Sequence, residues 1–249
     1  MDLLRRLMLG ALLLSAMPLL AADFRVATLV NEPYSILVAD KVSGISVDLI
    51  REAAHRLHKS VQIDIMPWAR ALRECERGSA DIILNVVRTP EREQFLEYVP
   101  TAVTWEEAVF IVPQHSALHF DGNLEALRGS VVGTGRGFRF GEPVDQAFAS
   151  GLLRREDHNT VAIMLNILSF GRLTIGMADK TLGAYEMRKL GLAGQLKILE
   201  PPLTHVPSYF AVSKKGKAAG LAPEFDRVLK QMLKDGSYAK IRARYVAND

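Results

Sequence analysis

The sequence predicts an α/β protein of two lobes, each a mostly parallel sheet flanked by helices. Strand-like apolar segments alternate with amphipathic helical segments, and this alternation occurs twice along the chain. Asp81–Val87 is a nearly continuous apolar run, as expected for a strand covered on both faces. Two further apolar segments, Ala108–Val112 and Ser208–Val212, are predicted to cross between the lobes.

The first alternation begins with a predicted strand at Phe24–Leu29. The following helix has an apolar stripe made of Val47, Ile50, Ala54 and Leu57. Val61–Ile65 alternates apolar and polar residues, which is typical of a strand. Another helix is predicted from Trp68 to Arg77, because Gly78 is a usual helix-ending residue.

The second alternation follows Val112. Its predicted strands are Ser130–Thr134, Leu173–Ala178, Gln195–Leu199 and Ser208–Ser213. Its predicted helices are Glu142–Ser150, Asn159–Phe170 and Lys180–Leu190. A last helix, Pro223–Lys234, is expected to return to the first lobe. The predicted first lobe is therefore 23–110 with 209–249, and the second is 111–208.

Residues 1–22 are typical of a cleavable signal peptide. Arg5 and Arg6 precede the apolar run Leu7–Leu20, and Ala21 and Ala22 follow it. The run is shorter than the ~20 residues that a membrane span requires. We expect a mature protein that is free in the periplasm, with an uncleaved anchor as the alternative.

Composition excludes some function classes. The formal net charge is only +3, and basic residues are scattered rather than clustered, which argues against nucleic-acid binding. Cys75 is the single cysteine, so no intrachain disulfide can form. It shares a predicted helical face with Trp68 and Leu72, which indicates a buried, unreactive thiol.

Eight short motifs follow one another in a characteristic order. They are Asn31–Tyr34, Gly44–Leu49, Pro67–Leu72, Gly78–Ile83, Arg88–Glu93, Leu127–Gly133, Gly171–Leu173 and Ser208–Lys214. Together they resemble the polar amino-acid-binding type of periplasmic solute-binding protein, the substrate-binding family of ABC importers. The resemblance implies the type II periplasmic-binding-protein fold, with two hinge crossings. It also implies a monomer without a cofactor, which binds an amino acid or related carboxylate and delivers it to a membrane ABC permease.

The resemblance assigns the two charged ends of the ligand to opposite lobes. Arg92 is expected to hold the carboxylate, because a guanidinium presents a planar fork of donors. Thr89 would add a hydroxyl and a helix-terminal N–H group. Asp179 would hold the ammonium group. From the residues alone, Arg92 could instead pair with Glu93 or Glu97, and Asp179 could be only a helix cap.

Aromatic residues are implied at the apolar part of the ligand. Tyr34 and Trp68 occupy those motif positions, although Trp68 also lies on the apolar face of its predicted helix. Val87, with Asn85, replaces small hydroxyl residues that the family often carries on the third strand.

The loop Gly135–Gly141 departs from the family pattern, because it lacks the usual Ser or Thr. Gly137, Phe138 and Arg139 are the expected ligand contacts there. We hypothesise that Arg136 or Arg139 enters the cleft and favours a ligand with extra negative charge. Two solvated arginines are the alternative.

Enzyme signatures are absent from the sequence. It has no Gly-x-Ser-x-Gly elbow and no His-Glu-x-x-His helix, and the histidines lack metal-ligand spacing. We predict no catalytic residues and no metal site. Two alternatives remain open: a ligand-sensing protein for a membrane receptor, and a dehydratase-like enzyme on the same fold.

Overall fold

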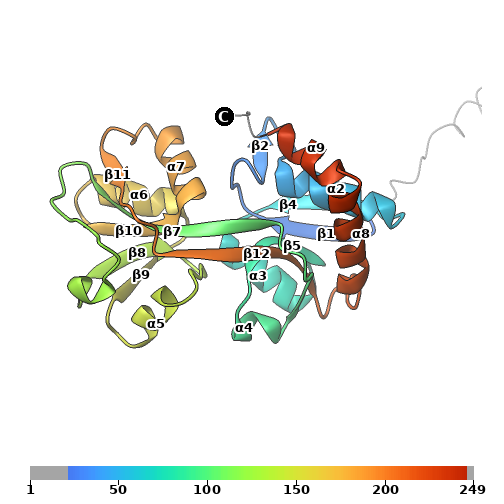
Figure 1. Ribbon diagram of the computed structural model, residues 1–249, viewed down its shortest axis with the longest axis horizontal. Coiled ribbons are helices and arrows are strands. Elements are labelled where there is room, and N and C mark those ends of the chain that lie inside the picture. The colour runs from blue at the N-terminus through green and yellow to red at the C-terminus, as the bar shows by residue number, and fades with distance from the viewer. Residues whose placement is uncertain (1–21, 246–249) are drawn as a thin grey trace, which may run out of the picture.

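The computed structural model describes residues 22–245. One mixed sheet extends through both halves of the molecule, in the strand order β4-β1-β5-β12-β7-β10-β8-β9. Two long antiparallel strands, β7 (Thr104–Pro113) and β12 (Thr204–Ser213), lie at its centre and join the halves (Figure 1). A parallel group of three strands flanks them on each side.

The first half contains the amino-terminal strands and both carboxy-terminal helices. Its strands are β1 (Phe24–Thr28), β4 (Val61–Ile65), β5 (Ile82–Val87) and β6 (Leu96–Tyr98), with a hairpin of β2 (Ile36–Val38) and β3 (Lys41–Ser43). Its helices are α2 (Ile45–Arg56), α3 (Trp68–Arg77), α4 (Pro90–Glu93), α8 (Ala222–Lys234) and α9 (Ser237–Ala243). Helices α8 and α9 pack beside α2 (Figure 1), so the chain returns to the half in which it began.

The second half lies beyond the crossing strands. Its strands are β8 (Val131–Gly135), β9 (Arg154–His158), β10 (Ile175–Asp179) and β11 (Leu196–Ile198). Its helices are the 3₁₀ turn Leu124–Leu127, α5 (Val144–Ala149), α6 (Val161–Ser169) and α7 (Lys180–Lys189). Strand β9 was not predicted, because all five of its residues are charged or polar and most are exposed at the edge of the sheet.

The crossing strands contribute to the apolar cores on both faces of the sheet. Successive side chains of a strand point to opposite faces. In β12, Phe210 and Val212 pack into the core under α2 and α8, whereas Ala211 packs into the core under α3. In β7, Phe110 and Val109 divide in the same way between the two cores of the second half. The carboxyl-terminal half of β12 is therefore fixed in the core of the first half, and that of β7 in the cores of the second half.

Most predicted elements are confirmed, and α3 has the predicted bounds, Trp68–Arg77. The crossing strands, however, begin four residues earlier than predicted, at Thr104 and Thr204. Their first residues are polar or exposed, so hydrophobicity did not mark them. The predicted signal peptide falls on residues 1–22, of which 1–21 lie outside the described residues. Within residues 22–245, every helix is too short or too polar to span a lipid bilayer.

Cys75 is fully buried in the core under α3, as predicted. Burial raises the pKa of its thiol to about 12, and the nearby charges of Asp81 and Glu74 add to the rise. The thiolate is the reactive form, so the native protein keeps this cysteine unreactive.

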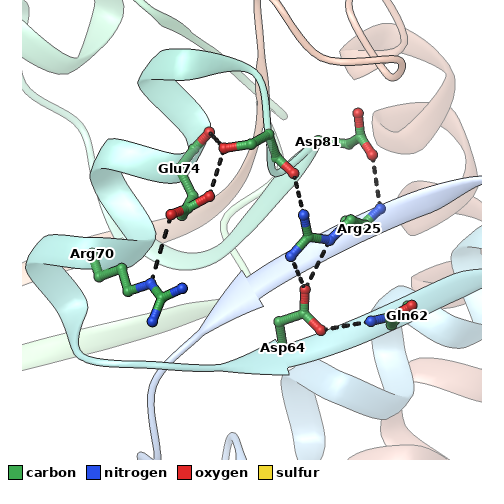
Figure 2. Close-up of polar contacts among 7 residues, drawn as sticks. Arg25, Gln62, Asp64, Arg70, Glu74 and Asp81 are labelled. Atoms are coloured by element: carbon green, nitrogen blue, oxygen red, sulfur yellow. Dashed lines mark hydrogen bonds and ion pairs between the residues drawn. The ribbon is translucent and has the colours of Figure 1, made fainter.

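A buried carboxylate connects three segments at the outer end of the first half. Asp81, directly before β5, accepts hydrogen bonds from the backbone N–H groups of Arg25 in β1 and Lys217 before α8. Figure 2 shows the contact to Arg25 together with the more exposed pair of the Arg25 side chain with Asp64. An N–H group that is buried without an acceptor carries its full desolvation cost.

We therefore predict that Asp81→Ala lowers the free energy of unfolding by about 2–4 kcal/mol, because two backbone donors lose their acceptor. Asp64→Ala is the matched control. It removes the partly exposed ion pair with Arg25 and should cost no more than about 1 kcal/mol. Urea denaturation measures both values. Equal destabilisation by the two variants would contradict this account of Asp81.

Candidate functional site

A narrow cavity lies between the two halves. It is lined by Leu29, Asn31, Trp68, Asn85, Val87, Arg92, Glu106, Phe138, Arg139, Asp179 and Leu182. Several of these residues lie at or just beyond the carboxyl ends of β1, β5, β8 and β10. Ligands of α/β proteins commonly bind beside this end of parallel strands. The cavity is therefore the candidate binding site.

Arg92 joins the two halves across this cavity. Its side chain is almost completely buried, and burial lowers the pKa of the guanidinium. One terminal nitrogen donates to the carbonyl oxygen of Val87 at 2.6 Å, and the other to that of Gly137 at 2.8 Å. Among the described residues it forms no ion pair with Glu93 or Glu97; Glu93 pairs with Arg88 instead. A guanidinium has five N–H donors, so others can still reach a bound anion.

The position of Arg92 is set by the first turn of α4. The Thr89 hydroxyl oxygen accepts from the Arg92 N–H group at 3.3 Å and donates to Glu91 at 2.8 Å. Thr89 therefore caps the short helix and does not line the cavity. The structure thus shows the Thr89 hydroxyl in the helix cap that positions Arg92.

Asp179 reaches the cavity from the end of β10. One carboxylate oxygen accepts from Leu182 N–H at 2.9 Å and so caps α7; the other accepts from Glu107 N–H at 3.1 Å. The same carboxylate therefore caps a helix and lines the cavity. Burial raises the pKa of Asp179, although its backbone hydrogen bonds oppose the rise.

Glu106 is a site residue that sequence reasoning missed. It comes from crossing strand β7 and lines the cavity with Asp179. Burial raises the pKa of Glu106 to about 8, and the neighbouring Asp179 charge adds to the rise. The only sequence signal is its place two residues before Ala108, within a strand whose predicted start lay after it.

The structure places the two predicted aromatic residues, Trp68 and Tyr34, in different environments. Trp68 lines the cavity, and its ring lies 6.1 Å from that of Phe138 and 5.7 Å from the Arg92 guanidinium. Tyr34 does not line the cavity. It packs against the core of the first half, because its loop turns the ring toward that core and brings Asn31 to the cavity instead.

The loop after β8 closes one side of the site. Phe138 packs against apolar side chains of both halves. Gly137, with φ +79°, approaches Ala69 and Leu72 of α3, so its contact is with Arg92 and α3 rather than with the cavity. Arg139 lines the cavity and lies 3.9 Å from Glu91 of the first half. Arg136 is exposed and does not line it.

Two amide side chains in the wall lack partners. Asn31 and Asn85 are more than nine-tenths buried. Among residues 22–245, the side-chain nitrogen and oxygen of Asn85 have no hydrogen-bond partner. The side-chain oxygen of Asn31 also has none within these residues. Asn85 has a left-handed φ of +51°, where the pairing of β5 with β12 shifts by one residue. Strain and unpaired polar atoms that are held by the surrounding fold are typical of a ligand site.

Known proteins resemble this chain in sequence and in fold. A probable amino-acid-binding protein of Bacillus subtilis, YxeM, is 18% identical over 224 residues, covering 90% of this chain and 83% of that protein. An ancestral arginine-binding protein solved with arginine has a TM-score of 0.74 at 20% identity, covering 90% of this chain and 98% of that one. A histidine kinase sensor domain has a TM-score of 0.76 at 21% identity, covering 90% and 95%.

Fold and cavity together define a two-lobed solute-binding protein with the type II periplasmic-binding-protein fold. Residues 24–248 match the bacterial extracellular solute-binding proteins, family 3, and the chain belongs to that family. The family resemblance inferred from the ordered motifs is therefore confirmed. Within residues 22–245, no group of three or more His, Cys, Asp or Glu side chains is arranged to hold a metal ion.

The raised pKa values of Glu106 and Asp179 predict that the stability of the protein depends on pH. A carboxyl group whose pKa is raised by folding stabilises the native state below its ordinary pKa, and this contribution is lost as pH rises. Wild-type protein should therefore lose stability relative to Glu106→Gln between about pH 4.5 and pH 8, by up to ~1.4 kcal/mol per pH unit. Urea denaturation across this range measures the difference.

Glu107→Gln is the matched control, since Glu107 lies 3.7 Å from Lys180 and outside the cavity lining. It should keep the wild-type pH profile. A constant difference between wild type and Glu106→Gln at every pH would show that folding does not raise the pKa of Glu106.

Proposed function

We propose that the protein binds a small zwitterionic solute, an α-amino acid or a close relative, in the cavity between its halves. The observation that carries this proposal is the placement of Arg92 and Asp179 on opposite halves but in one cavity wall. Arg92 suits a carboxylate and Asp179 an ammonium group. The names of the similar proteins, which bind amino acids or arginine, support the assignment.

The balance of charge supports a zwitterion over the acidic ligand that we hypothesised from Arg139. The cavity contains Arg92 and Arg139, but it also contains Glu106 and Asp179. The two acids offset the two arginines when all four are ionised. A ligand with one carboxylate and one ammonium group adds no net charge to this buried space, where an unpaired charge is costly.

Binding would operate by closure of one half onto the other. We take 23–110 with 209–249 as one moving body and 111–208 as the other, with bending in the crossing strands. Arg92 already bonds to Gly137 of the opposite half, and Phe138 packs against Trp68. A ligand that contacts both halves stabilises the closed state more than the open one, which is the requirement for a population shift.

The cellular role that fits this chemistry is solute capture in the periplasm and delivery to an ABC importer. The family is one of extracellular solute-binding proteins, and the amino terminus has the pattern of a cleavable signal. The closed form would present a surface from both halves to the permease. We propose a monomer that binds without turning over its solute.

A thermal-shift panel of the common L-amino acids, acidic analogues, amines and sugars tests the proposal on refolded, ligand-stripped protein. A ligand at a hundred times its Kd should add ~2.7 kcal/mol of stability and raise the unfolding midpoint. Arg92→Ala should abolish the shift, because the carboxylate loses its charged donor.

Arg88→Ala is the control, because Arg88 precedes the same helix but is exposed and pairs with Glu93 outside the cavity. It should bind like wild type. If no amino acid or carboxylate stabilises the wild-type protein, the proposed function is wrong. Binding that survives Arg92→Ala unchanged would exclude this assignment of the carboxylate.

A further inference from the structure

We propose that Glu106 and Asp179 together form a two-carboxylate subsite for the cationic nitrogen of the ligand. This inference rests on the proposed function and extends it, since it makes a crossing strand part of the binding surface. It also restricts the ligands to compounds with an ammonium group, of which α-amino acids are one class. A hydroxy acid of the same shape would lack the cation that both carboxylates require.

The strand register places the two acids on one face of the sheet. Asp179 of β10 lies directly opposite Ala108 of β7. Glu106 is two residues before Ala108, so its side chain points to the same face. Diagonal neighbours of this kind lie roughly 7–8 Å apart, within reach of long side chains. Both side chains line the same cavity, which agrees with the register.

The next residue of the strand provides an internal contrast. Glu107 points to the opposite face, where its carboxylate lies 3.7 Å from Lys180 and its cross-strand partner on β12 is His205. Glu106 pairs with Val206 on β12 and faces the cavity instead. Two adjacent acids of one strand are therefore in different environments, because one pairs with a lysine on the outer face and the other lines the cavity.

The enclosed acids lack a cation of their own. Within residues 22–245, neither Glu106 nor Asp179 forms an ion pair. Two positive side chains share the cavity, but both are engaged elsewhere: Arg92 donates to the carbonyl oxygens of Val87 and Gly137, and Arg139 lies nearest to Glu91. Two carboxylates that share a buried site cannot both stay ionised at low cost, unless a cation lies between them.

The unpartnered amides of the wall are a second, independent observation that points to a ligand here. Asn31 and Asn85 line the same cavity, and the Asn85 amide is held there by strained backbone. Amide oxygens and nitrogens can accept from an ammonium group or donate to a carboxylate. The cavity thus combines two acids, two amides and the Arg92 donors, which together match both ends of an amino acid.

Ionisation of the acid pair should follow cation binding. Burial raises the pKa of both carboxyl groups; the charge of Asp179 adds to the rise at Glu106, and the charge of Glu107 adds to the rise at Asp179. Arg92, which faces them from α4, opposes the rise at Glu106. Below the raised pKa one carboxyl group holds a proton, and an arriving ammonium group favours its loss. Binding near neutral pH is therefore expected to release about one proton.

Calorimetric titration in buffers of different ionisation enthalpy tests this linkage. The probe is each L-amino acid that stabilises the wild-type protein, beside the α-hydroxy acid with the same side chain. Glu106→Gln should weaken amino-acid binding roughly ten- to hundred-fold, the usual effect of losing a charged hydrogen-bond partner, and should remove most of the proton release. Glu107→Gln should match wild type in both, and the hydroxy acid should bind weakly to all three.

A second probe separates this proposal from the proposed function. Methylammonium chloride should raise the unfolding midpoint of wild type and Glu107→Gln above that in potassium chloride, but not that of Glu106→Gln. If methylammonium protects in this pattern while no amino acid binds, the amino-acid assignment fails and the cation subsite stands. Amino-acid binding with affinity and proton release unchanged in Glu106→Gln overturns the subsite, as does equal methylammonium protection of wild type and Glu106→Gln.

Discussion

The two crossing strands are the constraint on which the rest of this structure depends. The carboxyl-terminal half of β12 is fixed in the core of the first half through Phe210, and that of β7 in a core of the second half through Phe110. Residues 105–107 and 205–207, in the amino-terminal parts of the two strands, pair with one another and are not fully buried, and Glu106 among them lines the cavity. The proposed closure would bend the sheet at this segment while each half keeps its own packing.

Enclosed charge is the second organising feature. The site places Arg92 and Arg139 with Glu106 and Asp179 in one small space. Arg92 satisfies part of its donor capacity with backbone oxygens of both halves, and Asp179 accepts backbone N–H groups from β7 and α7. Charges held by backbone groups are already positioned before a ligand arrives, so less ordering remains at binding.

Much of the candidate site could be predicted because the family motifs fix local positions. Arg92, Trp68, Val87 and Asp179 line the cavity as the motifs implied. Thr89 and Tyr34 do not line the cavity, although the motifs implied ligand contacts for both. The Thr89 hydroxyl caps α4, and the Tyr34 ring packs against the core of the first half. Both outcomes depend on where a side chain points, which a motif does not specify.

The sequence by itself determined the alternation of strands and helices, the two halves and the family, because hydrophobic periodicity and ordered motifs are local properties of the chain. Only the tertiary structure decided which charges meet. Glu106 and Asp179 are 73 residues apart, and their proximity follows from the register of β7 against β10. Register is set by the packing of whole strands against both cores, so no segment read alone contains it.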